Sequence, residues 1–125
     1  MEGRRILIVE DDADLRRVFR FALAVHGYNV IEAENGLHAL RALELEPPDL
    51  VILDLGLPMV SGYAVLEECA LQSHLRDVPV VVVTGSTVEL SHANVACVLF
   101  KPVTPDRLVE TVRTYLDGSA PRAGE

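Results

Sequence analysis

Polar residues that could carry chemistry stand directly after four apolar stretches of this chain. Glu10 and Asp11 follow the first stretch, Asp54 ends the second, and Thr84 and Lys101 follow the other two. The apolar stretches are rich in valine, isoleucine and leucine, as expected for strands covered on both faces of a parallel sheet. The carboxyl ends of parallel strands lie at one edge of a sheet, so these side chains are expected around a single crevice if the strands that carry them are neighbours. An isolated aspartate after a strand more often begins a turn, so the case for Asp54 depends on its expected neighbours.

Three carboxylates in one crevice would repel one another. Two unit charges about 4 Å apart repel by about 4 kcal/mol at an effective dielectric constant near 20, so such a cluster needs a raised pKa or a bound cation. Carboxylate oxygens suit Mg2+ (or Mn2+), which keeps several waters and shares its shell with phosphate. Asp54 could then act as a nucleophile that accepts a phosphoryl group, whose oxygens Thr84 and Lys101 could bind.

The elements that must position these residues alternate along the chain as strand and helix. Right-handed crossovers between the strands then require a parallel sheet with helices on both faces. The predicted fold class is therefore α/β, with a doubly wound five-stranded sheet. The second strand has mixed polarity and is expected near a sheet edge. The strands are expected at Arg4–Val9, Tyr28–Ala33, Asp49–Asp54, Val78–Val83 and Val95–Phe100.

The first predicted helix is amphipathic. Asp12 or Asp14 can cap its start, and Gly27 is the expected residue just after its end. Its inner face holds apolar residues at i, i+3, i+4 and i+7, namely Leu15, Val18, Phe19 and Ala22. Three arginines are expected to point outward, namely Arg16, Arg17 and Arg20.

Four further helices are predicted from caps and apolar spacing. Asn35 is expected to cap the second helix, and Thr104 is expected to cap the last one, with Pro105 at its first position. The fourth helix can only be short and weak, at Val88–Ala93. The inner faces of the second, third and last helices are expected to hold Ala39, Leu40 and Leu43; Val65, Leu66 and Cys69; and Leu108, Val112, Tyr115 and Leu116.

Composition limits the function classes. The 125 residues suit a single domain, with a core at about 4–116 and a flexible tail at 117–125. A formal net charge of -8 argues against a nucleic-acid partner, and no apolar stretch is long enough for a membrane span. Cys69 and Cys97 lack metal-ligand spacing, and no signal peptide is apparent, so a reduced, cytoplasmic chain is expected.

Four motifs at the ends of the strands together resemble the receiver domain of two-component response regulators. They are Ile-Val-Glu-Asp-Asp at 8–12, Val-Ile-Leu-Asp-Leu-Gly-Leu-Pro-Met-Val-Ser-Gly at 51–62, Val-Val-Val-Thr-Gly at 81–85 and Phe-Lys-Pro at 100–102. Each motif alone is weak, but the ordered set is specific and covers about residues 4–116. The resemblance implies a flavodoxin-like fold, similar to that of the chemotaxis regulators, with strand order 2-1-3-4-5.

The resemblance also implies roles for the residues at the strand ends. Asp54 would accept a phosphoryl group from a sensor histidine kinase or a histidine phosphotransfer protein. Asp11 would bind Mg2+ directly, Glu10 partly through water, and Gly56 through its backbone carbonyl. The metal would also contact Asp54.

On the other side of the site, the resemblance makes Thr84 the switch hydroxyl and Lys101 the partner of the phosphoryl group. It also implies a cis peptide bond between Lys101 and Pro102. Gly56 and Ser86, two residues beyond the phosphoacceptor and the switch hydroxyl, occupy the positions that tune dephosphorylation in this family.

Two departures from the family pattern concern the step after phosphorylation. Val98 stands where the family usually has an aromatic residue that reorients with the switch hydroxyl. Phe100 shares the strand face of Val98 and could replace part of the missing bulk. The interval from Thr84 to Lys101 is also shorter than usual, which leaves little room for the fourth helix, and this puts the family's usual output surface in doubt.

Three functions are to be distinguished for a chain with these features. The leading one is a phosphorylated signalling switch that catalyses only its own phosphorylation and dephosphorylation and acts on a downstream protein effector, as a monomer or a weak phosphorylation-dependent dimer. The second is a receiver-like interaction module whose output does not need phosphorylation, as Val98 and the shortened fourth helix would suggest. The intact set of three carboxylates argues against it, because their repulsion is costly. The third, an unrelated phosphate enzyme, is disfavoured because a Walker loop and a dinucleotide motif are absent and position 56 is glycine rather than a second aspartate.

Overall fold

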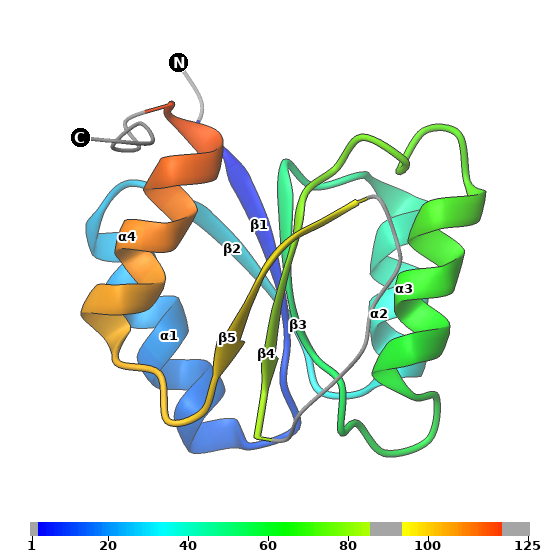
Figure 1. The fold of residues 1–125 in the computed structure, drawn as a ribbon, viewed down its shortest axis with the longest axis horizontal. Coiled ribbons are helices and arrows are strands. Elements are labelled where there is room, and N and C mark those ends of the chain that lie inside the picture. Colours follow the sequence, from blue (N-terminus) through cyan, green and yellow to red (C-terminus); the bar gives the residue numbers. More distant parts are fainter. Residues whose placement is uncertain (1–2, 86–93, 119–125) are drawn as a thin grey trace.

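The computed structural model describes residues 3–85 and 94–118, which form the strands and helices drawn in Figure 1. Three sequence predictions lie outside these ranges: the short helix at Val88–Ala93, Ser86, and residues 119–125 of the tail. The elements in chain order are β1 (Arg5–Val9), α1 (Ala13–Val25), β2 (Asn29–Ala33), α2 (Gly36–Leu45), β3 (Leu50–Asp54), α3 (Gly62–Leu71), β4 (Val80–Thr84), β5 (Val95–Phe100) and α4 (Pro105–Leu116).

The five strands form one parallel sheet in the order β2-β1-β3-β4-β5. Helices α1 and α4 cover one face, and α2 and α3 cover the other (Figure 1). The doubly wound α/β fold and its strand order are therefore confirmed, and β2 lies at an edge as its mixed polarity predicts. Strand β4 begins two residues later than predicted, at Val80, and includes Thr84.

Each face of the sheet has its own apolar core. Alternate residues of the buried strands, such as Ile8 and Ile52, face α1 and α4, while Val9 and Leu53 face α2 and α3. Strands β3 and β4 are buried along their whole length. This burial on both faces explains why their sequences are continuously apolar rather than alternating. A carboxylate at the end of such a strand is thus carried on a rigid support.

The helix ends follow the predicted capping residues. Asp12 caps α1, since its side chain accepts hydrogen bonds from the backbone N–H groups of Asp14 and Leu15. Asn35 and Thr104 cap α2 and α4 in the same way. Gly27 follows α1 with φ +91°, a left-handed conformation that favours glycine.

Two predictions for the faces of α1 are wrong. Val18 is 47% exposed, and Leu23 is fully buried instead, because the buried stripe runs through Phe19 and Leu23. Arg16 does not point outward: its side chain is only 15% exposed and lies against Glu32 of the edge strand β2. The helical spacing alone could not reveal this acidic partner on a neighbouring strand.

The last helix differs from its prediction at one position. Tyr115 is 41% exposed, and its hydroxyl donates a hydrogen bond to the carbonyl of Ala96 in β5. Tyr28, just before β2, is buried, and its hydroxyl donates to Asp117 at a distance of 2.7 Å. Across the described ranges, no helix combines the length and the hydropathy that a bilayer span requires.

Candidate functional site

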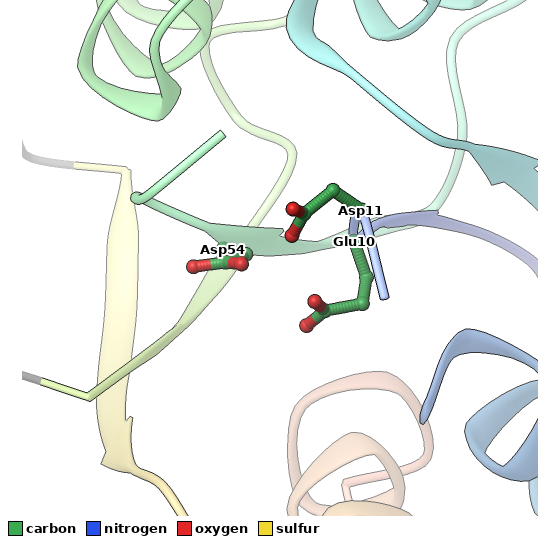
Figure 2. A group of neighbouring side chains, drawn as sticks. All are labelled: Glu10, Asp11 and Asp54. Atoms are coloured by element: carbon green, nitrogen blue, oxygen red, sulfur yellow. The ribbon is translucent and has the colours of Figure 1, made fainter. Parts of the chain in front are cut away.

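Three carboxylates meet at the carboxyl edge of the sheet. Strands β1 and β3 are neighbours, with Val9 paired to Leu53, so Glu10 and Asp54 come at the same level just beyond this pair. One carboxylate oxygen from each of Glu10, Asp11 and Asp54 lies within 4.8 Å of the other two. Glu10 and Asp54 are buried, at 3% and 6% exposure, and Asp11 is exposed. Figure 2 shows the three side chains at the ends of these two strands.

A single ammonium group faces two of these carboxylates. Lys101 Nζ lies 3.1 Å from Glu10 Oε1 and 3.4 Å from Asp54 Oδ2. Its backbone N–H donates to the carbonyl of Thr84, at 2.7 Å, and the Lys101–Pro102 peptide bond is cis. Lys101 is also the only lysine in the whole sequence. The sequence prediction that Lys101 lies beside the acidic cluster is therefore correct in its geometry.

Backbone amides orient two of the carboxylates. The N–H of Asp12 donates to Glu10 Oε2 at 3.2 Å, and the N–H of Gly56 donates to Asp54 Oδ1 at 3.0 Å. A carboxylate that accepts such bonds is held in one orientation and is stabilised in its charged form. Each of these carboxylates therefore has one oxygen on a backbone amide and the other toward Lys101.

The charges of the site perturb one another. Burial raises the pKa of Glu10, and the charge of Asp54 adds to this, while the N–H of Asp12 and the ammonium of Lys101 oppose it. Burial alone would lower the pKa of Lys101, but the hydrogen bond and the charge of Glu10, together with Asp54, raise it overall. One ammonium thus offsets only part of the negative charge of three carboxylates.

The donor set fits a hard divalent cation. Three carboxylate oxygens that can approach one another within 4.8 Å, one of them on the exposed Asp11, offer oxygen ligands and leave room for water. Mg2+ prefers such a small set of carboxylates and keeps several waters in its shell. The predicted carbonyl ligand belongs to Gly56, which is exposed and next to the site. These roles remain predictions from the sequence.

Thr84 and Val98 belong to the neighbouring strands β4 and β5. Thr84 is the buried last residue of β4 and pairs in register with Phe100 of β5. Val98 is half-buried and packs against the core formed with α2 and α3. Phe100 is 57% exposed, so it does not supply the buried bulk that an aromatic residue at position 98 would give.

Sequence reasoning missed one residue that touches the acidic turn. Arg16 Nη1 donates to the backbone carbonyl of Glu10 at 2.7 Å, and its Nε donates to Glu32 at 2.9 Å. The only available signal was a charged residue early in a helix that follows an acidic pair. That signal is weak, because an arginine on a helix is most often solvated.

A doubly wound parallel sheet carries an acidic cluster and one lysine at its carboxyl edge, which is the arrangement that the four sequence motifs predict. Residues 6–113 match the model of the response regulator receiver domain, and the chain belongs to this family. Receiver domains are modules of two-component signalling, not metabolic enzymes. The resemblance noted from the four sequence motifs is thereby confirmed.

Curated relatives agree with this assignment. The chain is 32% identical to the polar-differentiation response regulator DivK of Brucella anthropi, over 90% of this chain and 96% of the relative. It is 33% identical to the probable transcriptional regulator ycf27 of Porphyridium aerugineum, over 93% of this chain. The match spans only about half, 49%, of that relative's length.

Solved structures show the same fold. A CheY-like response regulator receiver domain protein from Methanospirillum hungatei has a TM-score of 0.83 and 28% identity, covering 94% of this chain and 96% of that one. The receiver domain of sensor histidine kinase PA1611 from Pseudomonas aeruginosa has a TM-score of 0.82 and 27% identity, covering 92% and 98%. That neighbour holds a magnesium ion in its active-site cleft.

Proposed function

We propose that this domain accepts a phosphoryl group on Asp54 in the presence of Mg2+ and thereby changes its contact with a partner protein. The observation that carries the proposal is the arrangement of charges around Asp54. A buried carboxylate lies with two other carboxylates within 4.8 Å and with an ammonium group 3.4 Å away. Such a site is costly without a cation, and an anionic phosphoryl group needs this balance of charges to approach a carboxylate.

The donor is a phosphohistidine of a sensor histidine kinase or of a histidine phosphotransfer protein. An oxygen of Asp54 attacks the phosphorus atom, the bond between phosphorus and the histidine nitrogen breaks, and the imidazole leaves and takes up a proton. The N–H of Gly56, 3.0 Å from Asp54 Oδ1, orients the attacking carboxylate. Positioning of this kind supplies much of the catalysis in phosphoryl transfer.

The cation would be held by Glu10, Asp11, Asp54 and the backbone carbonyl of Gly56. When bound, it would neutralise part of the charge on the carboxylates and on the phosphoryl oxygens. The magnesium in the neighbouring receiver domain of PA1611 supports this choice of metal. Mn2+ has the same preference for oxygen ligands and would substitute.

After transfer, Lys101 and Thr84 respond to the new negative charge. Lys101 leaves its contact with the carboxylate of Asp54 and pairs with a phosphoryl oxygen, and the hydroxyl of Thr84 donates to another. These two residues are joined by the 2.7 Å bond between the Lys101 N–H and the Thr84 carbonyl. The ends of β4 and β5 therefore move together, with Val98 in place of the usual aromatic residue.

The test is exposure to acetyl phosphate with Mg2+, followed by intact mass measurement. The expected product is one added phosphoryl group on the wild type, and none on Asp54→Asn or after chelation of the metal. Asp14→Asn is the matched control, because Asp14 lies near the same edge but its side chain is 93% exposed. Equal addition to the wild type and Asp54→Asn would refute Asp54 as the acceptor.

A further inference from the structure

The side chain of Arg16 connects the acidic turn to the edge of the sheet. It extends from the first turns of α1, and its Nη1 reaches the backbone carbonyl of Glu10 at 2.7 Å. Its side chain is only 15% exposed, whereas arginine side chains are mostly exposed in folded proteins. A charged donor at this distance makes one of the stronger hydrogen bonds to a carbonyl.

Glu32 of β2 holds the guanidinium of Arg16 in place. Its Oε1 lies 2.9 Å from Arg16 Nε, and its Oε2 lies 2.9 Å from Arg20 Nε. One carboxylate therefore pairs with two arginines one helical turn apart. Only Arg16 extends further to the turn that carries the acidic pair, whereas Arg20 is 45% exposed.

The peptide groups around Glu10 are held from both sides. The Glu10 N–H donates to the carbonyl of Ala33 at 3.1 Å, and the Glu10 carbonyl accepts from Arg16. That carbonyl belongs to the peptide group that links Glu10 to Asp11. Its orientation fixes the direction in which the exposed Asp11 leaves the strand. Figure 2 shows Glu10 and Asp11 projecting from this one turn.

We propose that Arg16, held by Glu32, is a positioning residue for the cation site. It orients the Glu10–Asp11 peptide group so that both carboxylates face Asp54 before the metal arrives. The inference rests on the proposed function, because it gives these carboxylates the role of metal ligands. When a group that orients metal ligands is removed, the affinity of the site for the metal typically falls by roughly 10- to 100-fold.

Arg16 and Arg20 form a matched pair for testing this. Replacing either by methionine removes one positive charge from α1 and one of the two partners of Glu32. Only Arg16→Met also removes the donor to the Glu10 carbonyl. A general effect of charge on the acidic cluster would appear in both variants, and an effect of positioning would appear in Arg16→Met alone.

Mg2+ binding is measured by titration calorimetry on the wild type and both variants, with thermal melting to confirm folding. The expected result is an affinity about ten-fold weaker in Arg16→Met and changed by less than about two-fold in Arg20→Met. Arg16→Lys retains the charge but has a single ammonium, so it should recover only part of the loss. Equal affinities in Arg16→Met and the wild type would refute the positioning role while leaving the proposed function intact. Wild type that does not bind Mg2+ would refute both.

A second measurement needs no metal. Amide hydrogen exchange at residues 10–12 in the metal-free protein should be faster in Arg16→Met than in Arg20→Met, because the acidic turn loses its outer hydrogen bond. If Arg16→Met fails to fold, Glu32→Gln provides the same test, since it weakens the anchor of Arg16 without removing the donor. Unchanged exchange and unchanged metal affinity in Glu32→Gln would overturn the inference.

Discussion

Replacing Lys101 by methionine is the sharpest test of the electrostatics of the site. The ammonium group lies 3.1 Å from Glu10 and 3.4 Å from Asp54, and both carboxylates are nearly buried. Methionine keeps most of the apolar volume of the side chain and removes the ammonium group, with its charge and its hydrogen-bond donors. In the variant, the buried carboxylates of Glu10 and Asp54 therefore lie close together without the neutralising ammonium group of Lys101.

The size of the effect follows from these distances. At an effective dielectric constant near 20, each contact contributes about 5 kcal/mol of Coulomb attraction, which is far more than the net loss. The loss is limited because Glu10 can take up a proton instead. Its ordinary pKa is 4.5, so protonating it costs at most about 4 kcal/mol at pH 7.5 and about 1.4 kcal/mol at pH 5.5, at 1.36 kcal/mol per pH unit.

The sign of the pH dependence is fixed by the same argument. In Lys101→Met the pKa of Glu10 in the folded protein rises further above its unfolded value. The folded state then binds a proton that the unfolded state has lost, so stability falls as the pH rises above 4.5. We expect a destabilisation of about 2–4 kcal/mol at pH 7.5 that shrinks to about 1 kcal/mol or less at pH 5.5.

Urea unfolding without metal at these two pH values measures the free energy of unfolding of the wild type and the variant. Arg17→Met is the control, because among the described residues Arg17 forms only an exposed ion pair with Asp14, at 3.5 Å. Its replacement should cost less than about 0.5 kcal/mol. A deficit of Lys101→Met that is equal at pH 5.5 and 7.5 would contradict the proton-uptake argument. Saturating Mg2+ should reduce the deficit, because a second cation then faces the carboxylates.

Three further predictions concern backbone packing, a buried hydroxyl and the thiols. Gly62→Ala would place a Cβ atom 2.5 Å from backbone atoms of Asp54, which ends β3, and of Leu55, which follows it, so urea unfolding should show a loss of about 1–3 kcal/mol in the free energy of unfolding. In Gly56→Ala the Cβ atom meets only an ordinary contact at 3.8 Å, and the loss should be less than about 0.5 kcal/mol. Burial and the hydrogen bond to Asp117 raise the pKa of Tyr28 to about 12. The unfolded state loses this proton near pH 10, so the melting temperature of the wild type should fall between pH 10 and pH 12. Tyr28→Phe should flatten that fall and lower the stability by about 1–2 kcal/mol at neutral pH. Burial raises the pKa of Cys69 to about 11, whereas Cys97 is only half-buried. Iodoacetamide at pH 8 should therefore label Cys97 first, which peptide mapping would show. Equal labelling of the two thiols would contradict the buried position of Cys69.

The sequence by itself determined the fold class and most of the site. Short continuous apolar runs rich in β-branched residues indicate strands covered on both faces, and their alternation with helical stretches indicates a parallel sheet. Parallel strands end at one edge, which places Glu10, Asp54 and Lys101 at the same edge. Their close contact also needed the strand order β2-β1-β3-β4-β5, which the resemblance of the four motifs implied. The caps at Asp12 and Asn35 were also local, because a cap depends on residues only a few positions away.

Only the tertiary structure decided which long side chains turn inward. The spacing of α1 predicted Arg16 as solvent-facing, yet Glu32 on the edge strand and the Glu10 carbonyl draw it in. Similarly, Phe100 shares the face of Val98 but is 57% exposed. Periodicity records which face of an element a residue occupies. It does not record which charged group a neighbouring strand places beside that face, because such partners are distant in sequence and adjacent only after folding.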